Sequence, residues 1–313
     1  MLTLQKFVEK INSRIKFDGT ARYGESMAGH TTFRTGGKAD LWIQPGSCFP
    51  EYVPFLLGEA KNEGIPVFIM GGGSNIVVSD RGIRGITLDT GGWKGMAEAP
   101  GFPAGKETEN QVLPDGQIKA EFRSGTAADE ASETAASLGL SGLEFLAGMP
   151  GTIGGAVWMN ARCYDRETAD VLAETLIIDE NLAYVKVPRN ANAFSYKKSP
   201  FQGRDLVIVS ASFTLQPRPE AEIREEMASH RDDREKKGHY RHPSAGSAFK
   251  NNRSFGKPSG KIIDELGLRG LSVGGAAVAP YHGNIIINTG AAASGDIRKL
   301  ASLVAARVKA ETG

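Results

Sequence analysis

The residues best suited to chemistry lie in one short segment, HPSAGSAFKNN at residues 242–252. Ser247 stands there between a glycine and an alanine. A serine acts as a nucleophile only when a base activates it, and AGSAF does not match the G-x-S-x-G pattern of hydrolases. Of the five histidines only His242 is close in sequence. By itself Ser247 is a turn residue or a doubtful nucleophile. Lys250 and Asn251 could hold an anionic substrate or could be surface residues of a strand.

A metal site finds little support in the sequence. His239 and His242 are three residues apart, but Pro243 follows them and disfavours the helical face that such a pair of ligands needs. Cys48 and Cys163 are far apart and lack CxxC spacing. We therefore expect no metal ion, and no disulfide framework either.

Two glycine-rich segments could approach a ligand closely. GGGSN at residues 71–75 lies between two apolar runs, where consecutive backbone N–H groups could face an anion such as a pyrophosphate, or could form a tight turn. GMPGTIGGAVWMN at residues 148–160 alternates small and apolar residues, which suits a flat or extended ligand. Close packing of backbone on backbone is the more ordinary interpretation of that second segment. Neither segment matches GxGxxG or the P-loop.

The elements that must position these residues can be predicted from apolar spacing and glycine punctuation. Helices are expected at residues 2–15, 50–63, 127–138, 220–237, 259–268 and 295–313. Strands are expected within residues 31–45 and 65–80, each as strand, glycine turn and second strand, and at 85–89, 118–124, 172–180, 183–188, 205–217 and 283–290. Residues 142–162 are expected to be a loop-rich core segment.

The type and order of the expected helices and strands change along the chain, which predicts an α+β protein of three domains. The alternation of strand and helix in residues 1–84 suggests a small first domain, residues 85–218 a second, and residues 219–313 a third that contains Ser247. Residues 98–115 form a polar excursion to which we assign no function. Ser294 is expected to cap the last helix.

Composition excludes several classes of protein. The chain has 313 residues, 40% of them hydrophobic and 23% charged, with a formal net charge of +1. This balance gives no electrostatic reason to expect nucleic acid or a membrane surface as a partner. No apolar run is long enough to span a bilayer, and the first residues do not form a signal peptide. With only two cysteines, a cytoplasmic protein is expected.

Taken together, six segments resemble the family of UDP-N-acetylenolpyruvoylglucosamine reductases, the MurB flavoenzymes of peptidoglycan precursor synthesis. The resemblance extends from about His30 to the C-terminus. The segments occur in the family's order and spacing: TTFRTGGKADL, GGGSNIVVSDRGIRG, GLEFLAGMPGTIGGAVWMNA, YKKSPF, PSAGSAFKN and GGAAVAPYHGNIIIN.

The resemblance implies a three-domain fold of the vanillyl-alcohol-oxidase and MurB type, with FAD held by the first two domains and substrate admitted by the third. It implies that the FAD pyrophosphate is cradled by Gly71, Gly72, Gly73, Ser74 and Asn75. The rest of the cofactor would be lined by Pro150, Gly151, Thr152, Gly154, Gly155, Ala156 and Asn160.

The implied reaction has two halves. NADPH reduces the flavin, and the flavin passes hydride to the enolpyruvyl double bond of a UDP-sugar, which leaves an enolate that must gain a proton. The family uses the serine of its GS-F motif as the proton donor, and that serine matches Ser247. The implied substrate contacts are Tyr196, Arg231, Arg234, Lys250, Asn251 and His282. For Arg231 and Arg234, a charged helix face is the competing interpretation.

Two positions depart from the family. SYKKS puts Lys197 where the family has an arginine, so the expected catalytic cation lacks the planar fork that grips a carboxylate at two points. A glutamate that the family carries just beyond its last helix has no match here, and we expect that the sequence is truncated rather than that another acid substitutes. These departures leave open an alternative, a catalytically impaired homologue that binds flavin and UDP-sugars. The family is usually monomeric, and a monomer is expected.

Overall fold

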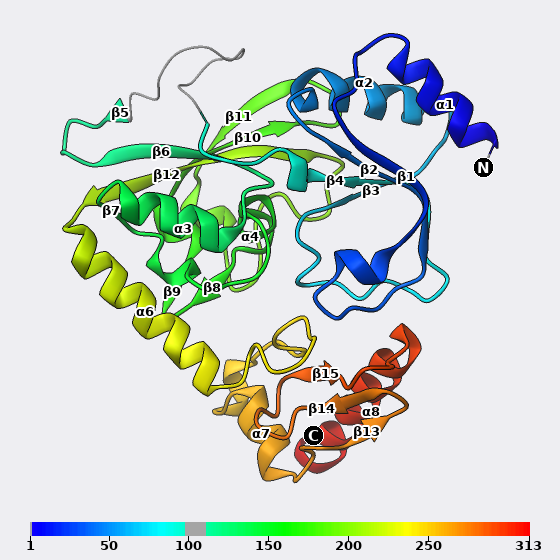
Figure 1. Cartoon of the computed structure of the whole chain (residues 1–313). Coiled ribbons are helices and arrows are strands. Elements are labelled where there is room, and N and C mark those ends of the chain that lie inside the picture. The colour runs from blue at the N-terminus through cyan, green and yellow to red at the C-terminus, as the bar shows by residue number, and fades with distance from the viewer. Residues whose placement is uncertain (1, 98–110) are drawn as a thin grey trace. The chain divides into compact units, whose positions relative to one another are not determined.

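The computed structural model describes residues 2–97 and 111–313 (Figure 1). The chain divides into two compact units. The first unit consists of Met1–Tyr23, Leu41–Gly72 and Gly85–Arg231, and the second consists of Gly24–Asp40, Gly73–Arg84 and Asp232–Gly313. The predicted α+β class is confirmed. A border of the compact units falls after Arg84, where one was expected, but the next falls after Arg231 and not after residue 218. The division into three domains stays a prediction.

A four-stranded sheet follows the N-terminal helix. Its strands, in spatial order, are β1 (Gly19–Ser26), β2 (Lys38–Pro45), β4 (Ile83–Asp89) and β3 (Val67–Met70). β3 and β4 are parallel, and they place Met70 opposite Asp89. The helices α1 (Leu2–Asn12) and α2 (Phe49–Asn62) bury apolar side chains together with those of the sheet: Phe7, Ile11, Leu41, Ile43, Phe49, Tyr52, Val53, Leu56, Ile86 and Leu88.

An antiparallel sheet forms the rest of the first unit. Its order is β11 (Tyr184–Pro188), β10 (Leu172–Ile178), β12 (Val207–Pro217), β6 (Ile118–Arg123) and β5 (Gln111–Val112), and β7 (Leu140–Ser141) also pairs with β12. Three helices and a hairpin accompany it: α3 (Ala128–Ser137), α4 (Ile153–Met159), α5 (Thr168–Val171), β8 (Arg162–Cys163) and β9 (Arg166–Glu167).

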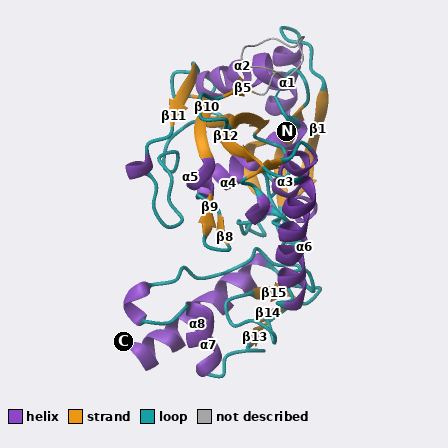
Figure 2. Ribbon diagram, turned by 90° about the vertical axis from the view of Figure 1, so that its left-hand side faces the viewer, coloured by secondary structure: helices purple, strands orange, loops and turns teal. Residues whose placement is uncertain are grey.

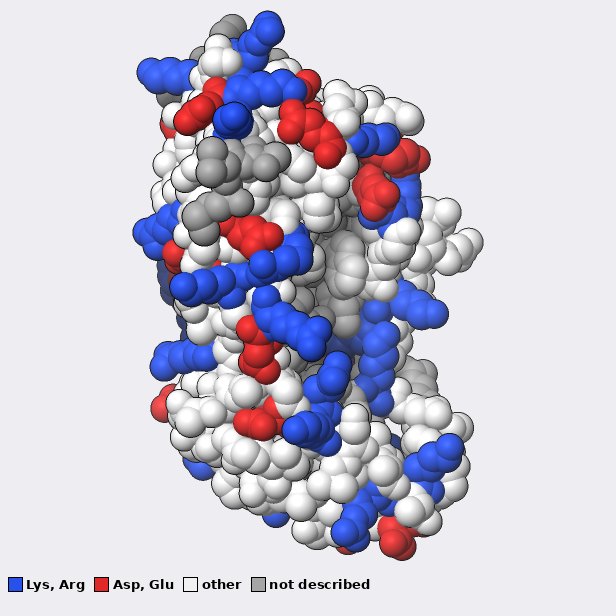
Figure 3. All heavy atoms as spheres, turned by 90° about the vertical axis from the view of Figure 1, so that its right-hand side faces the viewer, with Lys and Arg blue, Asp and Glu red and all other residues white. Residues whose placement is uncertain are grey.

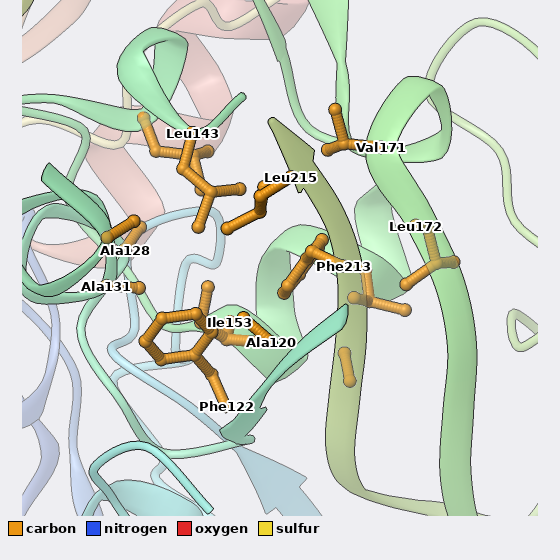
Figure 4. Close-up of a cluster of buried hydrophobic side chains, with 14 of the residues drawn as sticks. Ala120, Phe122, Ala128, Ala131, Leu143, Ile153, Val171, Leu172, Phe213 and Leu215 are labelled. Atoms are coloured by element: carbon orange, nitrogen blue, oxygen red, sulfur yellow. The ribbon is translucent and has the colours of Figure 1, made fainter. Parts of the chain in front are cut away.

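A buried cluster between this sheet and its helices fixes the start of α4. Figure 4 shows Ile153, the first residue of α4, beside Phe122 of β6, with Phe213 of β12 and Ala131 of α3 in the same cluster. The ring centroids of Phe122 and Phe213 are 6.2 Å apart. Since these side chains are fully buried, a shift of α4 would expose apolar area or open a void.

The second unit contains the C-terminal elements. Most of its elements follow α6 (Glu220–Lys236), within which the border between the units falls: α7 (Ser259–Glu265), β13 (Ser272–Val273), β14 (Ala276–Val278), β15 (Ile286–Asn288) and α8 (Ser294–Thr312). The three strands form a sheet in the order β13, β14 and β15, and α7 and α8 lie beside it (Figure 2). Short 3-10 helices complete the described chain: η1 (Met27–His30), η2 (Thr90–Gly92), η3 (Glu144–Leu146), η4 (Ala191–Ala193) and η5 (Arg253–Phe255).

The predicted helices and most predicted strands are present, but two strand predictions are wrong. Thr31, Phe33 and Thr35 are buried at alternate positions, as in a strand, yet Arg34 between them has a φ of 54°, so the backbone turns. Residues 76–80 are not a strand either. The loop-rich prediction for residues 142–162 missed α4. Of the polar excursion, residues 98–110 lie outside the described residues.

The predicted cap of α8 is also wrong. Ser294 is the first helical residue, and its Oγ accepts a hydrogen bond from Asp80 N at 2.8 Å. The carboxylate of Asp80 accepts from Ser294 N at 2.7 Å and from Gly295 N at 3.0 Å, so an acid 214 residues earlier in the chain caps the helix. These backbone hydrogen bonds, chiefly that of Ser294, lower the pKa of Asp80.

Charged residues of both signs lie on the molecular face that is shown in Figure 3, next to larger areas of other residues. On the face shown in Figure 3, lysine and arginine side chains lie among aspartate and glutamate side chains. Over the part of the chain that the structure describes, no helix is both long enough and apolar enough to cross a membrane.

Replacing Asp80 with alanine should weaken the second unit. The variant leaves two N–H groups of α8 without their acceptor, and we expect the free energy of unfolding by urea to fall by about 1–2 kcal/mol. Asp232→Ala is the control, because its pair with Lys236 is exposed and contributes little to stability. Since the pKa of Asp80 is lowered, the difference should be complete above about pH 4 and shrink below it. Equal stability of wild type and Asp80→Ala at pH 7 would contradict this assignment.

Candidate active site

The two glycine-rich segments touch each other in the first unit. A Cβ on Gly71 would lie 2.3 Å from Thr152 Oγ1, and a Cβ on Gly72 would lie 2.9 Å from Gly151 Cα. Gly71 directly follows β3, whose end is held by a hydrogen bond from Thr90 Oγ1 to Met70 O at 3.3 Å. Gly72 is therefore required by the close approach of two backbones, and Gly71 by the close approach of the Thr152 side chain. The contact joins the two segments predicted to hold the cofactor.

The remaining residues of the first glycine segment belong to the second unit. Gly73 has a φ of 60°, a Cβ on it would lie 2.0 Å from His30 O, and its own carbonyl accepts from Thr32 N at 3.2 Å. Only glycine fits such a position. Ser74 and Asn75 follow it in a turn.

The second glycine segment leads into α4. Thr152 is the N-cap, and its Oγ1 accepts from Gly155 N at 3.4 Å. Gly154 is buried, and a Cβ on it would lie 2.8 Å from the Cβ of Ser124. Pro150 and Gly155 are exposed, whereas Ala156 is buried. One face of this turn is thus packed against protein, and Gly155 lies on the surface.

Asn160 ends α4 and holds the next loop. It adopts the left-handed conformation, with a φ of 45°, which asparagine tolerates better than most residues. The buried carboxamide accepts from Ala169 N at 3.0 Å and donates to Ser195 O at 3.1 Å. This second bond fastens the segment that contains Tyr196 and Lys197 to the end of α4.

Two further hydrogen bonds tie the same loop to α4. Ser199 Oγ and Gln202 Nε2 both donate to Trp158 O, at 2.6 and 2.8 Å. Lys197 is half-buried and has a φ of 59°, an uncommon conformation for a lysine, while Tyr196 is exposed. The structure thus places Tyr196 and Lys197 next to the predicted cofactor segment within the first unit.

Ser247 lies in the second unit on an exposed segment. It forms an isolated bridge with Ile285. The following residues contact the start of α7: Asn251 Oδ1 accepts from Ser259 N, and Lys250 O accepts from Ser259 Oγ, each at 2.9 Å. Lys250 and Asn251 are therefore exposed residues at the start of a helix, not part of a strand.

Two neighbouring imidazoles in the second unit are held neutral. The ring centroids of His239 and His282 are 5.9 Å apart. Burial, followed by the charge of Arg234, lowers the pKa of His239 to about 4, and burial also lowers the pKa of His282. Neither ring is a cation at pH 7. Among the described residues, no cluster of three or more histidine, cysteine, aspartate or glutamate side chains could hold a metal ion.

The arginines of α6 differ in their surroundings. Arg231 bonds to Asp129 at 2.6 Å and to Glu133 at 2.5 Å, which favours a charged helix face over a substrate contact for this residue. Arg234 is buried, with 6% of its surface exposed.

Three buried hydroxyls beside the glycine segments lack a protein partner. They are Ser124 Oγ, next to Gly154, and Thr32 Oγ1 and Thr35 Oγ1, in the segment whose Thr32 N donates to Gly73 O. Buried hydroxyls are nearly always hydrogen-bonded, so each of these groups, within its own unit, has hydrogen-bonding capacity for a polar ligand atom. Sequence reasoning assigned no role to them, because an isolated serine or threonine carries no pattern of its own.

Comparison with known proteins identifies the family. Residues 238–313 match the model of the UDP-N-acetylenolpyruvoylglucosamine reductase C-terminal domain, and residues 50–185 match an FAD binding domain. The chain is 37% identical over 311 residues to the UDP-N-acetylenolpyruvoylglucosamine reductase of Borreliella burgdorferi, covering 99% of this chain and 95% of that one. It belongs to the UDP-N-acetylenolpyruvoylglucosamine reductase family.

Other relatives agree with this membership. The reductase of Treponema denticola is 37% identical over 316 residues, covering 96% of this chain and 93% of that one. The crystal structure of the reductase from Thermus caldophilus is similar with a TM-score of 0.69 and 28% identity, covering 92% of this chain and 94% of that chain. The resemblance and the FAD-binding fold predicted from six segments are confirmed. The roles of individual site residues stay predictions.

The reductase family membership makes Gly155 a useful test position. A Cβ there meets only Thr152 Oγ1 at 3.5 Å, an ordinary contact, so Gly155→Ala should fold and even gain about 0.5–1 kcal/mol of helix propensity. If FAD lies against this exposed glycine, its affinity should fall at least about tenfold, the equivalent of one poorly fitting contact. Flavin fluorescence titration of the apoprotein measures this.

Gly295→Ala is the matched control for that variant. Gly295 also lies near the start of a helix, and its Cβ would also meet one atom at 3.5 Å, Asp80 Oδ2. Unchanged FAD affinity in Gly155→Ala, or an equal loss in both variants, would remove Gly155 from the cofactor site.

Proposed function

We propose that this protein reduces UDP-N-acetylglucosamine enolpyruvate to UDP-N-acetylmuramate with NADPH, through FAD, in peptidoglycan precursor synthesis for the cell wall. The observation that carries the proposal is the similarity to named reductases over almost the whole chain, which includes an FAD-binding domain and a Ser247 segment together. Bound FAD would supply the hydride that is transferred from NADPH to the substrate.

The cofactor would be held by the two glycine-rich segments. The contact between Gly71–Gly72 and Gly151–Thr152, and the partnerless hydroxyls of Ser124, Thr32 and Thr35, support this proposal. Backbone N–H groups of the first segment would suit a pyrophosphate without adding charge. Gly73, Ser74 and Asn75 are proposed to complete the cradle, and Asn160 to line the cofactor.

Ser247 is proposed to protonate the substrate. Hydride addition to the methylene carbon of the enolpyruvyl group leaves a carbanion delocalised as an enolate, and the adjacent carbon must then take a proton. A serine hydroxyl is a weak acid, so both the enolate and the resulting alkoxide need nearby donors or cations. No histidine base is needed for this reaction, which agrees with the absence of a hydrolase pattern around Ser247.

Lys197 is proposed to bind the substrate carboxylate. Its left-handed backbone is held by the bonds of Asn160, Ser199 and Gln202 to and from α4, and such uncommon conformations persist where the surroundings fix them. Further substrate contacts are proposed for Tyr196, Arg234, Lys250, Asn251 and His282. Arg231 is the weakest member of the predicted set because two carboxylates already bind it.

A catalytically impaired flavin and UDP-sugar binding protein is the second candidate, because lysine stands where the family has arginine. Consumption of NADPH that depends on added enolpyruvyl sugar, with UDP-N-acetylmuramate identified by mass spectrometry, establishes the reductase. Binding of both ligands without turnover would instead establish the second candidate. A protein that takes up no FAD would contradict both. We also propose that the protein acts as a cytoplasmic monomer.

Replacing Ser247 with alanine should affect one half of the reaction. NADPH should bleach the flavin of Ser247→Ala at the wild-type rate, while reduction of the enolpyruvyl sugar should slow at least about a hundredfold, the usual contribution of a general acid. Stopped-flow absorbance separates these halves. Ser244→Ala, three residues earlier in the same segment, is the control. A normal rate of sugar reduction in Ser247→Ala would exclude Ser247 as proton donor.

Arginine at position 197 should be tolerated. Lys197→Arg keeps the charge and adds the fork that grips a carboxylate at two points, so turnover should be equal to or higher than that of wild type, with a lower KM for the sugar. Steady-state kinetics measures both. Lys198→Arg is the control for adding a guanidinium to the same loop. Loss of most activity in Lys197→Arg alone would show that the lysine has a role other than carboxylate binding.

A further inference from the structure

The segment that carries Ser247 has little regular structure of its own. Ser247 is exposed, and within the described part of the chain its strand pairing is limited to an isolated bridge to Ile285. Gly246 just before it has a φ of 71°, and a Cβ there would meet nothing within 4 Å. A hydroxyl on such a segment keeps one position only if other residues restrain the backbone.

Asn284 supplies this restraint. Its backbone oxygen accepts from Ala248 N at 2.8 Å. The side chain of Asn284 makes two hydrogen bonds to the backbone of Phe249, the residue after Ala248. Oδ1 accepts from Phe249 N and Nδ2 donates to Phe249 O, each at 2.9 Å. Asn284 has 4% of its surface exposed, so little water competes for these bonds. The carboxamide thereby bonds to both the N–H and the C=O of Phe249, as a residue of a neighbouring β-strand would.

The same residue also sets the proton position of a neighbouring ring. Asn284 N donates to His282 Nδ1 at 3.1 Å, which requires that nitrogen to be unprotonated. The neutral ring therefore carries its proton on Nε2. On the other side of Ser247, Asn288 N donates to Pro243 O at 2.9 Å, so the segment is held before and after the serine.

We propose that Asn284 is a positioning residue for the reduction of the sugar: it holds the backbone of Ala248 and Phe249 so that the Ser247 hydroxyl stays where the substrate carbon must be protonated. The inference rests on the proposed function. It assigns Asn284 no contact with substrate or cofactor, since both ends of its carboxamide are used by Phe249.

The test uses the FAD-loaded protein and follows the two halves of the reaction separately by stopped-flow absorbance. Flavin absorbance is lost on mixing with NADPH, and it returns when the reduced protein meets the enolpyruvyl sugar. In Asn284→Ala the return should slow at least about tenfold while the loss stays within about twofold of wild type, because a small misplacement of a reacting group affects only the step that uses it. The solvent deuterium isotope effect on the return should rise, because protonation becomes the slow step.

Two further variants keep the test decisive. Asn284→Asp fills the same volume and keeps the acceptor for Phe249 N, but it loses the donor to Phe249 O, so its return should slow as well. Asn252→Ala removes an exposed carboxamide from the same segment, which accepts only from Ser254, and should behave as wild type.

The outcomes separate the two proposals. If the wild-type protein shows no return of absorbance with the sugar, the proposed function fails and the inference fails with it. If wild type turns over and both Asn284 variants match it, the positioning role alone is overturned. A loss of FAD content, or equal slowing of both halves, would show a general structural role and would also overturn it.

Discussion

The first unit depends on one constraint, the approach of backbone to backbone where its two sheets meet. Gly71 and Gly72 lie against Thr152 and Gly151, and a Cβ on either glycine would lie closer than real Cβ atoms come to other atoms. Gly125 is equally confined, since its Cβ would lie 1.9 Å from Thr90 O. Because these glycines carry no side chain, Gly72 and Gly125 approach the backbone of neighbouring segments directly, and Gly71 approaches Thr152. Close packing and the proposed ligand binding thus both require that these positions carry no side chain.

The second unit depends on a different kind of contact, because it joins three segments that are distant in sequence. Its three short strands and two helices bury Phe33 from the N-terminal part of the chain. Asn288 Nδ2 donates to Phe33 O at 2.9 Å, and Asp80 caps α8. Each link is a buried or partly buried polar group paired with backbone, whose loss would leave unpaired N–H or C=O groups. Polar pairing therefore acts together with the burial of Phe33 to define where these segments lie.

Much of the fold could be predicted from the sequence because its elements have strong local patterns. The helix at residues 220–237 is charged throughout, the strand at 205–217 is rich in β-branched and aromatic residues, and both are present. Residues 31–37 misled the prediction because alternating burial of Thr31, Phe33 and Thr35 imitates a strand, although Arg34 turns the backbone. The role of Asp80 could not be found, since the acid that caps α8 lies 214 residues away. Likewise Asn284 and Ser124 carry no local motif, and only tertiary contacts reveal their surroundings.

The electrostatics of the second unit bear on how an anionic substrate would be received. His239 and His282 are neutral because burial disfavours their charged forms, and the positive charge of Arg234 lowers the pKa of His239 further. Charges of both signs act on these rings, among them those of Lys237, Arg269 and Asp264, and each neutral ring keeps one N–H group that can donate a hydrogen bond. A negative charge bound close to both rings would favour their protonated forms and raise both pKa values, so binding and proton uptake would be linked. Such linkage follows from the burial of the rings and does not depend on which phosphate or carboxylate group of the substrate is bound.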